Sequence, residues 1–130
     1  MTFPLFDLTG KRALVTGSSQ GIGLTLARGL AEHGASVVIN GRDAGKLATA
    51  SRSLSEAGHD VHVSTFDVTD HGEVKSAVDA IERDIGPIDI VVNNAGMQFR
   101  APLDVCPPDK WDQLLRTNIS SVFYVSQSVA

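Results

Sequence analysis

The feature that most constrains this chain is a glycine-rich stretch, Thr16 to Gly23, which reads Thr-Gly-Ser-Ser-Gln-Gly-Ile-Gly. It follows the apolar run 13–15 and leads into a helical pattern whose apolar residues share one face: Ile22, Leu26 and Leu30. The first backbone N–H groups of a helix have no partner inside the helix and carry partial positive charge. A strand, a glycine turn and a helix N-terminus in this order therefore predict a seat for a phosphate or diphosphate.

Each glycine of this stretch has a steric reason. We expect Gly17 to allow a sharp turn, Gly21 to let the backbone approach a ligand, and Gly23 to let the helix lie close to the sheet. Ser19, Gln20 and Ile22 lie between them and belong to the same predicted binding segment. No Lys-Ser or Lys-Thr follows, which excludes a P-loop. The alternative is a tight turn without a ligand.

Strand and helix patterns then alternate with short connections. We expect strands at 11–16, 36–40, 61–66 and 88–92, the last apolar enough to be buried on both faces. Helices are expected at 21–33, at 44–57 with Asp43 as its cap, and around 74–85. A last helix begins at 109, with a buried side formed by Trp111, Leu114, Leu115, Val122 and Val125. This alternation predicts an α/β fold of the Rossmann type, a doubly wound parallel sheet with helices on both faces.

Composition excludes several other classes of protein. The 130 residues carry a net charge of −4, which argues against nucleic acid or an anionic membrane as a partner. No stretch is long enough for a membrane-spanning helix, and residues 1–7 lack a signal-peptide pattern, so we expect a cytoplasmic protein. The single cysteine, Cys106, is interpreted as a small apolar filler. The four histidines lack metal-ligand spacing, and we expect no metal site.

The chain stops inside an apolar helix, at Val129-Ala130. Its four expected strands are fewer than the roughly six of the complete two-half dinucleotide fold. We therefore expect residues 1–130 to be the N-terminal cofactor-binding part of a longer, single Rossmann domain.

Four motifs at this mutual spacing resemble the short-chain dehydrogenase/reductase family: Thr16-Gly17-x-x-x-Gly21-x-Gly23, Asp67-Val68, Asn93-Asn94-Ala95-Gly96 and Asn118. The similarity extends from about Leu8 to Ala130. The segments 6–11 and 114–119 look most like the gluconate 5-dehydrogenase branch of that family. The resemblance implies an NAD(P)-dependent interconversion of a carbonyl and an alcohol.

The resemblance also implies roles for single residues. Asp67 would contact the adenine amine, Val68 would lie along the base, and Asn94, Ala95 and Gly96 would pack beside the adenosine ribose. Asn118 would be catalytic, because in the family such an asparagine holds a water in the proton relay to the catalytic lysine. Its apolar neighbours favour a buried, hydrogen-bonded position. Taken alone, Asp67 and the asparagines could be ordinary turn residues, and Asn118 a solvent-facing one.

The end of the second strand predicts the choice of nicotinamide cofactor. NAD-dependent enzymes usually place a carboxylate there, which binds the ribose hydroxyls and repels a 2′-phosphate. This chain reads Asn40-Gly41-Arg42 instead. A guanidinium suits a phosphate, so we predict NADP over NAD. The alternative is a surface ion pair between Arg42 and Asp43.

The family's other catalytic residues are not found in these residues. The only tyrosine, Tyr124, has Ser128 four positions later in place of lysine, so we assign it to packing and expect the segment alone to be inactive. Arg100 is the one cation of the loop after Gly96, and we expect it either to meet an anionic small-molecule substrate such as a sugar acid or to be solvated. Gluconate and 5-ketogluconate are the leading substrates; the alternatives are a 3-oxoacyl-thioester reductase and a non-catalytic NADP(H) sensor. The exposed apolar last helix suggests a homo-oligomer, although further chain could also cover it.

Overall fold

The computed structural model describes residues 4–130; residues 1–3, which belong to the stretch without a signal-peptide pattern, lie outside the described residues. Four strands form one parallel sheet in the order β3-β2-β1-β4. They are β1 (Arg12–Val15), β2 (Ser36–Gly41), β3 (Val61–Thr65) and β4 (Ile90–Val92). The predicted parallel α/β sheet is confirmed, and its order matches the first four strands of a Rossmann fold.

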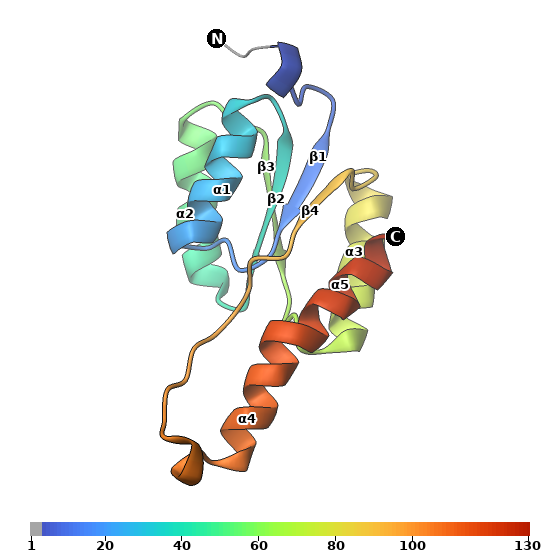
Figure 1. Cartoon of the computed structure of the whole chain (residues 1–130). Helices are drawn as coiled ribbons and strands as arrows, with labels where there is room; N and C mark the ends of the chain where they lie inside the picture. The colour runs from blue at the N-terminus through green and yellow to red at the C-terminus, as the bar shows by residue number, and fades with distance from the viewer. Residues whose placement is uncertain (1–3) are drawn as a thin grey trace.

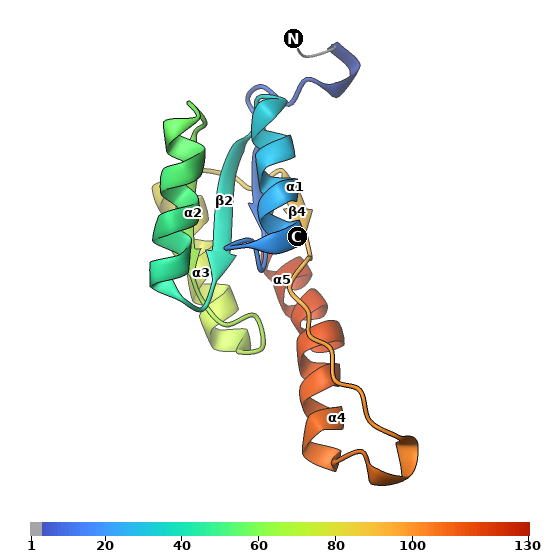
Figure 2. The same ribbon diagram turned by 90° about the vertical axis from the view of Figure 1, so that its left-hand side faces the viewer.

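Helices cover both faces of this sheet. In Figures 1 and 2, α1 (Gly21–Glu32) and α2 (Ala44–Glu56) lie on one face, and α3 (His71–Asp84) and α5 (Ser121–Val129) lie on the other. The helix α4 (Pro108–Leu115) extends beyond the sheet past its carboxyl end. Short 3-10 turns occupy Pro4–Phe6 and Leu103–Val105. The carboxyl ends of all four strands therefore open toward the region between α2 and α4.

The strands bury alternate side chains in two separate cores. Ala13 and Val15 of β1 pack with α1 and α2, whereas Leu14 between them packs with α3 and α5. Period-two alternation in a sheet covered on both faces produces this arrangement. The inner strands β1 and β2 are consequently almost fully buried. The outer strand β4, paired only with β1 among the described residues, is half-buried, contrary to the expected burial on both faces.

The predicted apolar face of α1 is wrong. Ile22 is 75% exposed and Leu26 is 40% exposed, and only Leu30 is partly buried against the core. The buried side of α1 consists of small residues: Gly23, Ala27 and Ala31. Small side chains let the helix axis approach the sheet closely, and the larger ones are thereby directed outward.

The last helix also differs from its prediction. It is interrupted by a π-helical turn at Arg116–Ser120, between α4 and α5. Val125 is fully buried as expected, and Leu114 and Leu115 are half-buried, but Trp111 is 57% exposed and Val122 is 37% exposed. Trp111 lies on α4, where the sheet offers no surface to pack against (Figure 2). Tyr124 does pack, because its ring stacks on that of His71 with 4.9 Å between ring centroids.

Candidate functional site

The glycine turn after β1 has the geometry that the sequence predicted. Gly17 and Gly21 have φ angles of +59° and +62°, in the left-handed region that favours glycine. A Cβ on Gly17 would lie 2.9 Å from the Cα of Ala95, and one on Gly21 would meet open space. A Cβ on Gly23 would collide with the carbonyl oxygen of Gly17. The turn is therefore closed on its inner side and open on its outer side.

Asn94 and Thr16 fasten this turn to the loop after β4. The Nδ2 of Asn94 donates to the carbonyl oxygens of Thr16 and Gly17, at 3.2 and 3.0 Å. The Oγ1 of Thr16 accepts from the backbone N–H groups of Asn94 and Ala95, both at 3.0 Å. Neutral hydrogen bonds of this kind are worth about 1 kcal/mol each, so these four bonds join the two loops.

The N-terminus of α1 differs from those of the next two helices. The side chains of Asp43 and Asp70 accept backbone N–H bonds at the starts of α2 and α3. At α1 the capping position is Gln20, whose side chain makes no such bond, and the first turn holds no acidic residue. The first N–H groups of α1 are thus left for an external anion, which is the condition for a phosphate seat.

An open cleft of about 860 Å³ lies at the carboxyl ends of the strands. Its volume is within the range of small-molecule and cofactor sites. Most of the predicted cofactor residues line it: Gly17, Ser19, Gln20, Arg42, Asp67, Val68, Asn94, Ala95 and Gly96. Gly21 and Ile22 instead line a neighbouring hollow on the outer side of α1, and Gly23 is buried beneath the turn.

The carboxylate of Asp67 stays ionised in this cleft. Burial raises the pKa of Asp67, but hydrogen bonds from Thr69 and the positive charges of Arg42 and Arg116 outweigh burial and hold the pKa below its usual value. The bonds come from the Thr69 hydroxyl, at 2.7 Å, and the Thr69 N–H, at 2.9 Å. An ionised carboxylate accepts hydrogen bonds only, so it suits a donor such as an amine.

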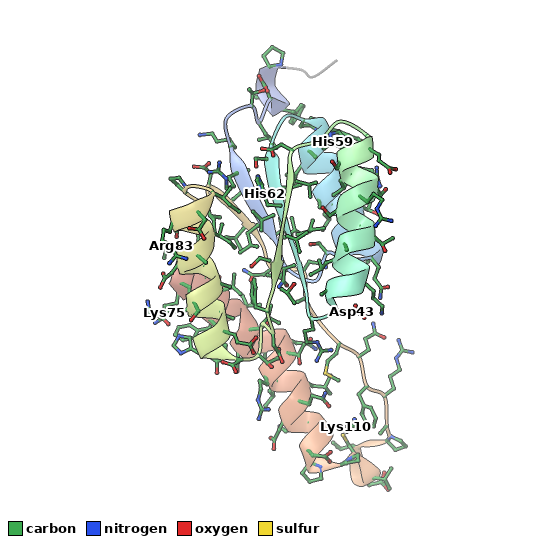
Figure 3. The ribbon with its side chains drawn as sticks, turned by 180° about the vertical axis from the view of Figure 1, so that it is seen from behind. Asp43, His59, His62, Lys75, Arg83 and Lys110 are labelled. Atoms are coloured by element: carbon green, nitrogen blue, oxygen red, sulfur yellow. The ribbon has the colours of Figure 1, made fainter. Side chains whose placement is uncertain are left out.

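Two cations line the cleft near the start of α2: Arg42 of the β2–α2 turn and Lys46 of the first turn of α2. Asp43, which caps α2, lies between them in the sequence (Figure 3). The Oδ1 of Asp43 accepts from the N–H groups of Gly45 and Lys46, at 2.9 and 3.1 Å. Within residues 4–130 the ion pairs are His62–Asp60, Lys75–Asp79 and Arg83–Asp84, so the alternative Arg42–Asp43 pair does not form. The guanidinium of Arg42 is therefore available to a ligand.

Asn118 lies in the π-helical turn, a feature that often marks functional sites. Its Oδ1 accepts from the N–H of Met97 at 2.9 Å, and its Nδ2 donates to the carbonyl of Met97 at 3.0 Å. The hydrogen-bonded position was expected, but the expected burial is wrong, because the residue is exposed among the described residues. Asn118 thus fixes the start of the loop that follows Gly96.

Arg100 also lies outside the cleft. It is exposed in the loop between Gly96 and Leu103 and does not line the cleft. The neighbouring Phe99 ring lies under Lys110 of α4, with Nζ 5.6 Å from the ring centroid. This contact holds the loop against the extended helix, away from the strand ends (Figure 3).

Several lining residues were missed from the sequence: Asn40, Lys46, Thr69, Gln113 and Thr117. A signal existed for two of them, because Gln113 and Thr117 are four residues apart in a helical segment and so share a face.

No helix among residues 4–130 is long and apolar enough to cross a membrane. In the same part of the chain, no group of three or more His, Cys, Asp or Glu side chains is placed to hold a metal ion.

The strand order, the bare helix N-terminus and the cleft at the strand ends define a Rossmann-type α/β protein. A family model described as short chain dehydrogenase matches residues 11–130, and the chain belongs to this family. It is 55% identical over 126 residues to gluconate 5-dehydrogenase of Gluconobacter oxydans, covering 97% of this chain and 49% of the relative. It is 45% identical over 125 residues to 5-keto-D-gluconate 5-reductase of Escherichia coli K12, covering 96% of this chain and 49% of the relative.

A solved structure is similar throughout the described fold. It is that of a gluconate 5-dehydrogenase from Burkholderia cenocepacia in complex with NADP and tartrate, with a TM-score of 0.92 and 53% identity. The match covers 95% of this chain and 49% of that one. The chain thus spans about half the length of the relatives it matches.

Proposed function

We propose that residues 1–130 form the N-terminal cofactor-binding part of a single Rossmann domain in an NADP-dependent oxidoreductase. The reaction is hydride transfer between the nicotinamide and a carbonyl or secondary alcohol. The observation that carries this proposal is the uncapped N-terminus of α1, beside a cleft whose rim holds an unpaired Arg42. Backbone N–H groups there suit a diphosphate, and the guanidinium suits a 2′-phosphate.

Each end of the cleft suits one part of such a cofactor. The segment Gly17 to Gly23 would hold the diphosphate, and the carboxylate of Asp67 would accept from the adenine amine, with Val68 along the base. Asn94, Ala95 and Gly96 would flank the ribose while Asn94 keeps the turn closed. The bound cofactor supplies or accepts the hydride, and these residues orient it.

Asn118 is proposed to serve catalysis through its position. Both polar atoms of its amide contact the backbone of Met97, which lines the cleft. One lone pair of Oδ1 and one N–H of Nδ2 remain, so the amide can still hold a water. Asn118 would therefore have two roles: it would shape the substrate side of the cleft, and it would bind the water of a proton relay.

A sugar acid, gluconate or 5-ketogluconate, is the proposed substrate. The similarity to proteins named for these compounds, at 55% and 45% identity, supports it. A second candidate is a 3-oxoacyl thioester, because the chain is also 37% identical to a rhamnolipids biosynthesis 3-oxoacyl-[acyl-carrier-protein] reductase of Pseudomonas aeruginosa. Turnover of 5-ketogluconate but not of an acetoacetyl thioester by the full-length protein would distinguish the two.

The cofactor choice is tested by titrating NADPH and NADH into the full-length protein. We expect NADPH to bind more tightly than NADH. Arg42→Ala should weaken NADPH binding by about tenfold or more and leave NADH binding unchanged, because a charge-assisted phosphate contact is worth roughly 1.5–3 kcal/mol. Arg52→Ala is the matched control, because Arg52 is an exposed arginine of α2 outside the cleft. Tighter binding of NADH to the unaltered protein would refute the choice of NADP.

Arg100 is proposed to bind the carboxylate of the substrate, which would require its loop to move toward the cleft from the exposed position described above. Arg100→Ala should raise KM for the sugar acid about tenfold with little effect on kcat, because a charge-assisted hydrogen bond would be lost. Lys75→Ala controls for a general loss of positive charge, because Lys75 is an exposed cation of α3 that does not line the cleft. An unchanged KM would leave Arg100 as a solvated loop residue.

We also propose that the full-length protein is a homo-oligomer. Apolar side chains line the outer side of the segment from α4 to α5: Trp111, Ile119, Val122 and Phe123. Exposed apolar surface of this kind marks an interface.

A further inference from the structure

The side chain of Asn40, the penultimate residue of β2, makes three hydrogen bonds at the strand ends. It is 1% exposed. Its Oδ1 accepts from the backbone N–H of Gly17 at 3.1 Å, and its Nδ2 donates to the carbonyl oxygens of Ser64 and Phe66, at 3.2 and 3.1 Å. One amide thus joins the turn after β1 to the end of β3.

The backbone of Asn40 strengthens the same connection. Its N–H donates to the Oγ of Ser18 at 3.0 Å, and its carbonyl accepts from the N–H of Ser18 at 2.8 Å. The Ser18 hydroxyl in turn donates to the carbonyl of Val15 at 2.6 Å. The glycine turn is therefore held on this side by the end of β2, as it is held on the other side by Asn94.

The two segments that Asn40 joins serve opposite ends of the proposed cofactor. Gly17 begins the diphosphate turn, and Phe66 immediately precedes Asp67 and Val68 at the proposed adenine end. We propose that Asn40 is a positioning residue that sets the separation between the diphosphate seat and the adenine site. This inference rests on the proposed function, because it assigns the two ends of the cleft to one dinucleotide.

The chemistry explains why an amide is needed at this position. One acceptor must face an N–H while donors on the same group face two carbonyl oxygens, and only a carboxamide of this length presents both. A carboxylate would place negative charge against the carbonyls of Ser64 and Phe66. The charged groups on the flanking turns are Arg42 and Asp43 after β2 and Asp67 and Asp70 after β3, whereas the three direct partners of the amide are uncharged backbone groups.

The test is Asn40→Asp in the full-length protein, with the dissociation constant of NADPH measured from pH 5.5 to 9. Burial and the two carbonyls should raise the pKa of the introduced carboxyl. When this carboxyl is ionised at high pH, NADPH binding should be at least tenfold weaker than in the unaltered protein. When it is protonated at low pH, it regains one donor, so the difference in NADPH affinity between the two proteins should shrink at least threefold. Gln127→Glu, an exposed amide-to-carboxylate change on α5, should show no such trend.

A difference that is equal at every pH, or absent throughout, would overturn the inference. Asn40→Ala gives a second measurement that does not depend on a buried charge. This variant should weaken the binding of NADPH, which spans both ends of the cleft, at least tenfold. It should weaken the binding of adenosine 2′-monophosphate, which lacks the diphosphate, less than threefold. Equal losses would mean that Asn40 is only structural. If the unaltered protein binds neither NADPH nor NADH, the proposed function itself fails. That outcome is measured on the unaltered protein, so it is distinct from any result obtained with the Asn40 variants.

Discussion

At the scale of single residues, the closest approach in the site is that of Gly23 to the turn beneath it. A methyl group there would collide with the carbonyl oxygen of Gly17 and lie 2.5 Å from the Nδ2 of Asn94. Gly23→Ala should therefore lower the free energy of unfolding by about 1–3 kcal/mol, as overpacking does, and weaken NADPH binding. Thermal melting and NADPH titration of the full-length protein measure the two effects.

Gly29→Ala is the matched control in the same helix. A Cβ at position 29 meets nothing within 4 Å, so the change should raise stability by up to about 1 kcal/mol through helix propensity and leave NADPH binding unchanged. Equal destabilisation by both variants would mean that α1 tolerates no added methyl group and that the approach of Gly23 is not special.

Residues of the glycine turn could be predicted from the sequence because their constraint is local. Gly17 needs a positive φ whatever surrounds it, and the motif order places it at a strand end. Asn40 could not be recognised in the same way. Its partners are 23 to 26 positions away along the chain, and only the parallel register of β1, β2 and β3 brings them together. The sequence thus indicated that this strand end lacks a carboxylate, but it did not indicate the hydrogen bonds that the amide makes.

At the scale of elements, the start of α2 combines a helix cap with the rim of the cleft. Asp43→Asn should keep the cap, because asparagine and aspartate cap equally well, and should remove a negative charge beside Arg42. We expect unchanged thermal stability and NADPH binding tighter by roughly twofold to fivefold, a surface effect below about 1 kcal/mol that weakens at high salt.

Asp70→Asn is the control for this change. Asp70 caps α3 in the same way, through the N–H of Glu73, but it does not line the cleft. NADPH titration in low and high salt should therefore separate the two variants. Tighter NADPH binding in both would indicate a long-range effect of net charge and not a local one at Arg42.

Helix positions were predictable from the sequence, but the faces of two helices were not. The capping Asp43 is a local signal, and it located the start of α2. The apolar period placed α3 around 74–85, whereas the helix begins at His71 with Asp70 as its cap. The face of α1 was assigned from its large apolar residues, yet the sheet selects small ones, because Gly23 must lie against the turn. The π-helical turn at Arg116–Ser120 has no local sequence signal. In the structure this turn contains Asn118, whose side chain accepts a hydrogen bond from Met97.

At the scale of the molecule, the strand order gathers the site from distant parts of the chain. The parallel pairing of β1 with β4 places the glycine turn beside the loop after β4, and β2 and β3 follow on the other side of β1. Their carboxyl ends therefore form one row, which ends at Asp67. Because α5 packs with α3 on one face of the sheet, α4 before it extends past the strand ends to the rim of the cleft (Figure 1).

The outer face of α4 and α5 leads to the last prediction. Phe123 and Ile119 are 60% and 62% exposed, and an interface between copies would bury both. Light scattering should show that the full-length protein is a dimer or tetramer. Phe123→Asp should reduce its mass in a concentration-dependent way, because a buried unpaired charge costs several kcal/mol. Val63→Asp, at an exposed apolar residue of the outer strand β3, should leave the mass unchanged. If Phe123→Asp lowers the melting temperature without changing the mass, the rest of the polypeptide covers this face and the homo-oligomer loses its support.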